Sequence, residues 1–321
     1  RLIGDMLMIV LTGGKTGGHI MPLLALAKQL NYVCYVGTAD SLEEGLCKNH
    51  QIEFLGLSLK NNHILGVLKC CFKLKLKNVE AIVSTGGYVS FPVLLYGIFH
   101  RIPIYLLEEN VIMGRTNHFF AFFAKKIFLT YPLKKMKKKY QVVGLPTITN
   151  QMSYLAYKNL SIDVLLIGGS LGSKPLCDLA YELKKRYKVC LIAGRYYKEY
   201  QKVDGIEVFE YVDDLPNLML QARTIISRAG ASTTYEIFSI GKPCILIPSE
   251  KTSKNHQYLN ALYFEKKGCC KLLREKDGKE GITSLVSYLL ENPEARMTMV
   301  EHQQRFVTKN SCKKIIEEIG I

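Results

Sequence analysis

The chain has 321 residues, of which 48% are hydrophobic and 22% are charged, and this composition excludes a disordered, collagen-like or low-complexity protein. At about 100–200 residues per domain, the length suggests two domains. Lys and Arg number 43 against 28 Asp and Glu, so the formal charge of +15 indicates an anionic partner: nucleic acid, an anionic membrane or a phosphorylated substrate.

Short apolar runs alternate with helical patterns along the chain, beginning with a strand at 7–11 and a helix at 21–30. Strands that alternate with helices predict parallel sheets built from βαβ units. The runs predicted as strands are 7–11, 32–36, 79–84, 104–107, 126–130, 164–167, 189–192, 207–209, 224–227 and 244–247, and a further short apolar piece begins at Val142.

One uncharged stretch, residues 81–100, is long enough to span a bilayer. Gly86, Gly87 and Pro92 interrupt it, so we expect a strand, a glycine turn and a helix there. The run at 7–11 is short and leads into glycines without a cleavage-site pattern, so we expect no signal peptide.

The ten cysteines show no C-x-x-C spacing, and the seven histidines show no H-E-x-x-H motif. We expect reduced cytosolic thiols that serve mostly as small core residues. A metal site or a disulfide framework is the alternative.

Both halves of the chain open with an apolar strand that runs into a glycine turn and then a helix. The two turns lie at 12–19 and 168–173. This similarity predicts an α/β fold with two doubly wound domains, whose boundary we place near 143–146. Ligands of such sheets bind beyond the carboxyl ends of the strands, so the cleft between the two domains is the expected site.

The first glycine turn is the strongest local signal for an anion site. Its glycines permit close backbone approach, and the following helix offers N–H groups to an anion. The fragment Gly14-Lys15-Thr16 imitates part of a P-loop, but Ile9 stands where that motif needs glycine. A tight structural turn is the alternative. His19 at the helix start is a candidate general base, or else a cap or packing residue.

The segment 227–236 has the pattern of a nucleotide diphosphate site. A strand ends, Gly230 turns the chain, and Ser232 and Thr233 open a helix where they can donate hydrogen bonds to phosphate. Glu236 shares their helix face and is placed to hold the two hydroxyls of a ribose. An ordinary helix cap with a surface glutamate is the alternative.

Three weaker segments could complete such a site. The turn at 168–170 would add a hydroxyl and backbone donors, and the strand end at 211–215 has a backbone edge that could read a base. Residues 255–260 start a helix with polar groups suited to sugar hydroxyls. In isolation this last segment reads as a cap and a solvated face.

Two lysine-rich segments lie in the first half. Residues 65–77 combine apolar residues at helical spacing with four lysines, which predicts a basic amphipathic helix that lies on an anionic membrane or packs on its own sheet. Residues 134–139 contain five lysines that could dock the same domain on a bilayer. Nucleic acid is the competing partner, but the chain lacks Trp and shows no recognised nucleic-acid module.

Six short motifs stand in order along nearly the whole chain. They are T-G-G-H-I-M-P at 16–22, G-G-Y-V-S at 86–90, L-E-E-N at 107–110, G-G-S-L-G at 168–172, R-A-G-A-S-T-T-Y-E at 228–236 and H-Q-Y-L-N-A at 256–261. Together they resemble the MurG family, the cytoplasmic UDP-N-acetylglucosamine (UDP-GlcNAc) transferases that make lipid II of peptidoglycan.

The resemblance implies the GT-B glycosyltransferase fold, with two Rossmann-like domains whose parallel sheets face a cleft. It implies an acceptor- and membrane-facing domain at 1–146, a UDP-sugar-binding domain at 147–305, and a C-terminal helix at 306–321 that returns to the first domain. The implied enzyme acts in peptidoglycan synthesis, and so in cell shape and division, as a peripheral protein on the cytoplasmic face of the bacterial membrane.

The activity implied by the resemblance is inverting transfer of GlcNAc from UDP-GlcNAc to the 4-hydroxyl of MurNAc in lipid I, the undecaprenyl-diphosphate acceptor. The chain shows no D-x-D motif, so we expect no tightly bound metal, although a divalent cation could stimulate the reaction. Two alternatives stay open: transfer to another membrane lipid such as diacylglycerol, and a non-catalytic nucleotide-sugar-binding scaffold at the membrane. Retained Glu236, Gln257 and His19 argue against the scaffold.

The resemblance also implies the residues of the site. Those implied to bind substrate are Thr16, Gly17, Gly18, Asn110, Ser170, Val212, Ala231, Ser232, Thr233, Glu236 and Gln257. Within this set, the Val212 backbone would read uracil and Glu236 would hold the ribose. The hydroxyls of Ser170, Ser232 and Thr233 would hold the diphosphate. The amide side chains of Asn110 and Gln257 would contact GlcNAc. The loop 16–19 would face the lipid diphosphate and the reacting hydroxyl. His19 is the first candidate for the base, and Glu108 is the second.

Three motifs depart from the family pattern at positions near the donor. The replacements are Ile148 for the arginine of N-P-V-R, Leu171 for the glutamine of G-G-S-Q-G, and Leu107 and Glu109 for the histidine and glutamine of H-E-Q-N. Lys15 and Arg195 are candidates to supply the missing positive charge.

Overall fold

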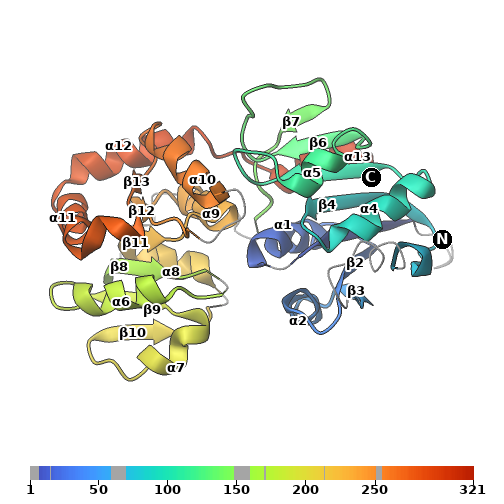
Figure 1. Ribbon diagram of the computed structural model, residues 1–321. Helices are drawn as coiled ribbons and strands as arrows, with labels where there is room; N and C mark the ends of the chain where they lie inside the picture. Colours follow the sequence, from blue (N-terminus) through green and yellow to red (C-terminus); the bar gives the residue numbers. More distant parts are fainter. Residues whose placement is uncertain are drawn as a thin grey trace. The chain divides into compact units, whose positions relative to one another are not determined.

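The computed structural model describes residues 7–14, 16–58, 70–147, 160–169, 171–212, 214–250 and 255–321. The chain divides into two compact units, drawn in Figure 1. Unit 1 comprises Arg1–Ile148 and Thr308–Ile321, and unit 2 comprises Thr149–Val307.

Unit 1 is built on a parallel sheet whose described strands follow the order β3-β2-β1-β4-β5-β6-β7. The chain order starts in the middle of the sheet, runs to one edge, and returns to the other side of β1, which is the doubly wound pattern. The strands are β1 (Met8–Gly13), β2 (Val33–Thr38), β3 (Glu53–Leu57), β4 (Val79–Gly86), β5 (Ile104–Glu108), β6 (Lys126–Leu129) and β7 (Tyr140–Val142).

Each face of the unit 1 sheet has its own apolar core. The helices that flank the sheet are α1 (Gly17–Ala27), α2 (Leu42–Asn49), α4 (Ser90–Phe99), α5 (Arg115–Phe120) and α13 (Ser311–Ile319). Successive side chains of β1 point to opposite faces. Ile9 and Leu11 therefore join the core that contains α1 and α13, whereas Met8 and Val10 join the core that contains α4. Because both faces are buried, the strand reads as a continuous apolar run.

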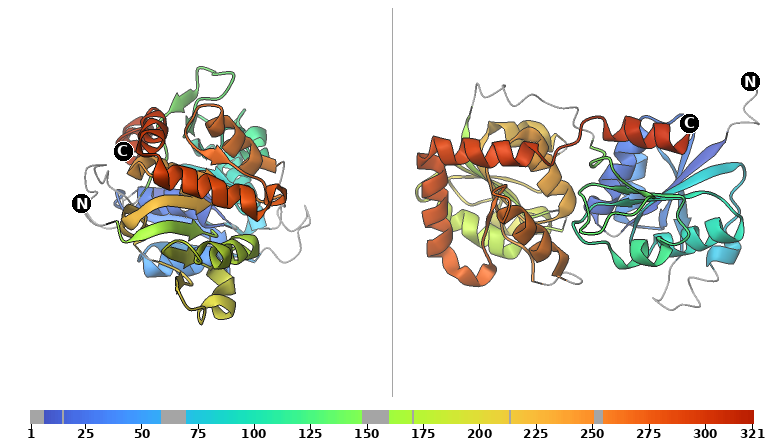
Figure 2. Two further views of the ribbon diagram at one scale, coloured as in Figure 1. Left: turned by 90° about the vertical axis from the view of Figure 1, so that its left-hand side faces the viewer. Right: turned by 90° about the horizontal axis from the view of Figure 1, so that it is seen from above.

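The last helix, α13, belongs to unit 1 although it follows the whole of unit 2 in sequence. Ile315 and Ile319 lie one turn apart on its apolar face and are buried in the same core as α1. A polar contact also joins α13 to the sheet, because the Glu318 carboxylate forms an ion pair with Lys126 of β6. Figure 2 shows α13 lying along the sheet of unit 1.

Unit 2 repeats the parallel design, with described strands in the order β10-β9-β8-β11-β12-β13. The strands are β8 (Ile162–Ile167), β9 (Val189–Ile192), β10 (Ile206–Phe209), β11 (Ala222–Ser227), β12 (Cys244–Leu246) and β13 (Lys271–Leu272). The helices are α6 (Lys174–Leu183), α7 (Tyr197–Tyr200), α8 (Leu215–Gln221), α9 (Ala231–Ile240), α10 (His256–Glu265), α11 (Gly278–Glu291) and α12 (Pro293–Gln304). One core of this unit joins α6 and α11 to the central strands.

The ten strands predicted with both ends are present in the structure, and no end differs by more than two residues. Two strands were not predicted. The edge strand β3 exposes three of its five residues and so shows no apolar run, and β13 has only two residues. The uncharged stretch 81–100 forms most of β4 and α4, as predicted.

The predicted amphipathic helix at 65–77 is wrong in its second half. Residues 70–73 are helical and residues 74–77 are not, while 65–69 lie outside the described residues. The sequence Lys-Leu-Lys-Leu-Lys at 73–77 alternates with a period of two, which suits an extended segment. The Tyr96 hydroxyl holds this segment by donating a hydrogen bond to the carbonyl of Leu76 at 3.1 Å.

In the part of the chain that the structure describes, no helix combines the length and the apolar composition that crossing a membrane requires. Nine of the ten cysteines are buried, which confirms the prediction that they serve mostly as core residues.

Replacing Ile315 by Ala should destabilise unit 1 by about 2–5 kcal/mol, because it removes a fully buried side chain and leaves a cavity between α13 and the sheet. Urea unfolding of the full chain measures the change. Glu317→Ala, on the exposed face of the same helix, is the matched control and should change stability by less than about 0.5 kcal/mol. Equal effects of the two variants would contradict the packing described for α13.

Candidate active site

Three loops of unit 1 emerge at the carboxyl ends of β1, β4 and β5, which are neighbours in the sheet. Gly13 at the end of β1 lies in register with Gly86 at the end of β4, and Glu108 is the last residue of β5. Because the strands are parallel, the three loops leave the sheet at the same edge, where doubly wound sheets bind their ligands.

The loop after β1 is held by two hydroxyl groups. Tyr35 donates a hydrogen bond to the carbonyl of Gly13 at 2.7 Å, and Thr85 donates one to the carbonyl of His19 at 2.8 Å. A Cβ atom at Gly13 would lie 2.0 Å from the Thr85 Oγ1 atom, so the close approach of β1 to β4 requires glycine. These contacts fix His19 in the first turn of α1.

The predicted phosphate-binding residues of unit 1 stand at the start of α1. The helix begins at Gly17, and its N-cap Thr16 is extended and makes no side-chain capping bond within the described residues. The first turn contains no acidic side chain that would repel an anion. Lys15 lies outside the described residues.

Glu108 is buried and fully engaged by its own loop. Its Oε1 atom accepts hydrogen bonds from the backbone N–H and the side chain of Asn110, at 3.0 and 3.2 Å. Its Oε2 atom accepts from the backbone N–H of Gly114 at 2.8 Å and from the Asn117 side chain at 2.9 Å. The second predicted base candidate thus organises the loop that carries Asn110.

His19 faces Glu109, which directly follows β5. The distance from His19 Nδ1 to Glu109 Oε2 is 3.6 Å, and the two side chains are 30% and 3% exposed. Burial lowers the pKa of His19, but the nearby carboxylate of Glu109 and the charge of Glu108 outweigh it and raise that pKa above its usual value. Sequence reasoning noted Glu109 only as a departure, because the pairing with His19 joins residues 90 positions apart.

The loop after β8 in unit 2 is a second tight glycine turn. Gly169 and Gly172 have φ angles of +80° and +71°, and a Cβ atom at Gly172 would lie 2.3 Å from the carbonyl oxygen of Ala193. Leu171 is exposed at the tip of this turn. Ser170, predicted to bind the diphosphate, lies outside the described residues.

Arg228 at the end of β11 connects this glycine turn to other loops of unit 2. Its Nε atom donates to Ser173 Oγ at 3.0 Å, and Nη1 donates to the carbonyl of Ile247 at 3.0 Å. Its Nη2 atom forms an ion pair with Glu275. The guanidinium therefore ties the segments after β8, β12 and β13 together. The sequence placed Arg228 in a motif, but its spacing gave no sign of these three partners.

The predicted ribose and phosphate residues share one face of α9, which begins at Ala231. Ser232 and Thr233 lie in the first turn, and Glu236 lies one turn later. Glu236 is half-buried, and burial raises its pKa to about 7. The helix has no acidic residue in its first turn, so its N-terminus is electrostatically suited to an anion.

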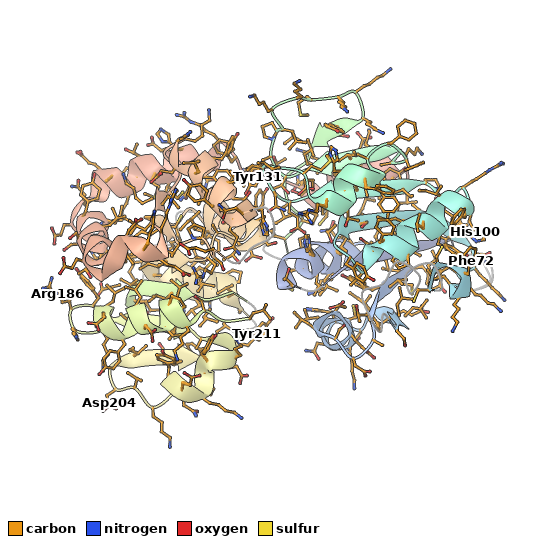
Figure 3. The ribbon with its side chains drawn as sticks, viewed as in Figure 1. Phe72, His100, Tyr131, Arg186, Asp204 and Tyr211 are labelled. Carbon is orange, nitrogen blue, oxygen red and sulfur yellow. The ribbon has the colours of Figure 1, made fainter. Side chains whose placement is uncertain are left out.

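Gln257 and Val212, the remaining predicted donor residues, lie in two further segments of unit 2. Gln257 in the first turn of α10 accepts a hydrogen bond from the backbone N–H of Ser249 at 2.9 Å, which leaves its amide NH2 group as a donor. Val212 directly follows Tyr211, which lines a surface pocket of about 420 Å³ at the end of β10. Tyr211 and Tyr197 are among its lining residues, and Figure 3 labels Tyr211.

No group of three or more His, Cys, Asp or Glu side chains in the described residues is arranged to hold a metal ion. The polar groups at the loop ends of both units are instead hydroxyls, amides, carboxylates, and the backbone at helix starts.

Similarity to known proteins identifies the family of this chain. Residues 9–129 match the glycosyltransferase family 28 N-terminal domain, and residues 163–319 match the C-terminal domain of that family. A Clostridium tetani protein named UDP-N-acetylglucosamine--N-acetylmuramyl-(pentapeptide) pyrophosphoryl-undecaprenol N-acetylglucosamine transferase is 31% identical, with 97% of each chain covered. The chain belongs to the MurG family of glycosyltransferases.

Other MurG-family members and solved structures agree. The protein of the same name from Desulfitobacterium hafniense strain Y51 is 32% identical, with 96% of this chain and 97% of the relative covered. The crystal structure of MurG from Acinetobacter baumannii has a TM-score of 0.81 at 24% identity and covers 98% of this chain and 99% of its own. The predicted GT-B fold, the glycosyltransferase activity and the MurG resemblance are therefore confirmed.

Replacing Glu108 by Gln should destabilise unit 1 of this MurG-family chain by about 1–3 kcal/mol, because an NH2 group would then face the N–H donors of Asn110 or of Gly114 and Asn117. Urea unfolding measures the loss. Glu53→Gln, which removes an exposed carboxylate of β3, is the control and should have little effect. Unchanged stability in Glu108→Gln would show that the four hydrogen bonds do not hold the loop.

Proposed function

We propose that this chain transfers GlcNAc from UDP-GlcNAc to the 4-hydroxyl of MurNAc in lipid I, with inversion, and so forms lipid II. The observation that carries the proposal is the similarity over almost the full length to proteins named for this reaction. The site geometry supports the same chemistry. Unit 1 has a histidine at the glycine-rich start of α1, and unit 2 has hydroxyls and a carboxylate near the start of α9.

Unit 2 would bind the donor. The α9 N-terminus, with Ala231, Ser232 and Thr233, would hold the diphosphate together with Ser170, and Glu236 would accept hydrogen bonds from the ribose hydroxyls. The backbone at Val212 would read uracil beside the pocket at Tyr211. Gln257, and Asn110 from unit 1, would hydrogen bond to GlcNAc.

Unit 1 would present the acceptor. The α1 N-terminus at Thr16, Gly17 and Gly18 would bind the lipid diphosphate, and His19 would take the proton of the attacking hydroxyl. The new bond joins that oxygen to the anomeric carbon, while the bond from this carbon to the phosphate oxygen breaks and UDP leaves with the electron pair. Helix N-termini would stabilise the leaving diphosphate, so we propose that no tightly bound metal is needed and that a divalent cation only stimulates.

Exposed aromatic and basic residues of unit 1 would dock the enzyme on the membrane. Phe72 is 77% exposed and stacks on Phe99 at the end of α4, where Figure 3 labels Phe72 and His100. Phe122 is 84% exposed, and its carbonyl accepts a hydrogen bond from Lys139, which joins it to the lysine-rich segment 134–139. Each lysine near an anionic surface contributes about 1 kcal/mol. We therefore propose a peripheral position at the cytoplasmic face of the bacterial membrane, without a nucleic-acid partner.

The direct test is UDP release from UDP-GlcNAc with and without a lipid I analogue. Wild type should release UDP only with the acceptor, and His19→Ala should lose about 10²–10⁴-fold in kcat, as expected for removal of a general base. His50→Ala, at the end of α2 and before β3, is the control and should keep its activity. Donor binding without release in the presence of the acceptor would contradict the proposal and favour another acceptor lipid or a scaffold.

The affinity for UDP-GlcNAc should rise with pH through about 7, the pKa of Glu236. Ribose hydroxyls donate to the ionised carboxylate, so binding favours the charged form, and affinity should increase about tenfold between pH 6 and pH 8. Calorimetric titration measures this change, and UDP-GlcNAc itself has no titrating phosphate in that range. Glu236→Gln should weaken binding and flatten the pH dependence; an unchanged profile in this variant would exclude Glu236 as the ribose ligand.

A further inference from the structure

Two buried groups of unit 1 face each other without completing a hydrogen bond. His19 Nδ1 and Glu109 Oε1 are both shielded from solvent and find no hydrogen-bond partner among the described residues. The second carboxylate oxygen of Glu109 lies 3.6 Å from His19 Nδ1. Buried polar atoms left unpaired are costly, and a carboxylate that is 3% exposed needs a cation or a donor.

The backbone on both sides of this pair is fixed. Thr85 holds the His19 carbonyl at 2.8 Å, and the neighbouring Glu108 is anchored through Asn110 and Gly114. Only a small rotation of either side chain is needed to bring 3.6 Å into hydrogen-bond range, and catalytic hydrogen bonds are often long before substrate binds.

We propose that Glu109 is a positioning residue that accepts the Nδ1–H of His19, and so makes His19 Nε2 the atom that takes the proton from the attacking hydroxyl. The proposal rests on the transferase function above. It also gives a role to the carboxylate that stands where the family pattern has glutamine, because an amide at this position would carry no charge to stabilise an imidazolium.

In the proposed step one proton moves from the acceptor hydroxyl to His19. The acceptor hydroxyl gives its proton to Nε2 while its oxygen forms the bond to the anomeric carbon and UDP leaves. His19 becomes a cation, and Glu109 stays an anion beside it, so the charge that develops on the ring is compensated at 3.6 Å or less. No proton needs to move to Glu109. The ring returns its proton to solvent through the exposed part of the side chain.

Other ionisable groups of unit 1 also act on the pair or lie near it. The charge of Glu108 raises the pKa values of both His19 and Glu109, and Glu109 contributes to the raised pKa of the Tyr35 phenol. The Glu43 carboxylate accepts a hydrogen bond from the backbone of Thr38 and lies beside the loop after β1. Among the described residues, the strongest influence that raises the pKa of His19 is Glu109, whereas burial acts in the opposite direction.

The pair sets the pH dependence of kcat. The reaction needs neutral His19, so kcat should rise with pH through the pKa of His19. Removing the carboxylate of Glu109 leaves burial to lower that pKa. In Glu109→Gln the acid limb of the kcat profile should therefore move to lower pH, while the plateau falls by about tenfold or more because the base is weaker and less well oriented.

The experiment is an NMR titration of the His19 ring in the full chain, with the signal assigned by its loss in His19→Ala, followed by pH profiles of acceptor-dependent UDP release. Glu109→Gln should lower the pKa of His19, and Glu109→Asp, which keeps the charge, should restore part of it and part of kcat. Glu53→Gln removes an exposed carboxylate of the same unit and should change neither. The KM for UDP-GlcNAc should stay near the wild-type value in Glu109→Gln.

Two results would overturn the proposal. An unchanged pKa of His19 in Glu109→Gln would show that the groups are not coupled, and a loss of kcat without movement of the acid limb would show a merely structural role. The titration needs no turnover. If wild type itself releases no UDP with the acceptor, the proposed function fails, and the titration still decides whether Glu109 controls the proton on His19.

Discussion

Parallel strand pairing is the constraint on which the loop arrangement of each unit depends. In each sheet the first strand of the unit lies between the second strand and a strand that follows a crossover, so the chain leaves adjacent strands in different directions at one edge. At that edge unit 1 places Gly13 beside Gly86, and unit 2 places the ends of β8 and β11 side by side. Apolar residues on both faces of the strands pack in the cores and so fix the positions of the strand ends. Glycines and small side chains in the loops then allow neighbouring loops to approach each other closely.

Two consecutive carboxylates, Glu108 at the end of β5 and Glu109 directly after it, have different environments. Glu108 points into its own loop and is surrounded by N–H donors, whereas Glu109 points toward α1 and meets a single imidazole. The alternation of side chains at a strand end places the two carboxylates in these different environments. In unit 2 the loops are held by a cation instead of a carboxylate, since the Arg228 guanidinium contacts three loops.

The sequence predicted most of the fold, because buried parallel strands are continuous apolar runs and most predicted strands, such as 189–192, are present as expected. It failed where that signal is absent, at the exposed edge strand β3 and at 74–77, where alternating lysines are extended instead of helical. For the site, motifs identified His19 and Glu236, but no spacing rule connects His19 with Glu109 or Arg228 with Glu275. Such contacts depend on tertiary packing between loops that are far apart in sequence.

In the proposed function, unit 2 binds the nucleotide sugar and unit 1 supplies the base. Calorimetric binding of UDP-GlcNAc to Glu236→Ala and to His19→Ala, without acceptor, tests it most directly. Donor binding should be lost in Glu236→Ala and kept within a few-fold of wild type in His19→Ala. Loss of donor binding in His19→Ala with retention in Glu236→Ala would contradict it and would place the nucleotide on the glycine loop of unit 1.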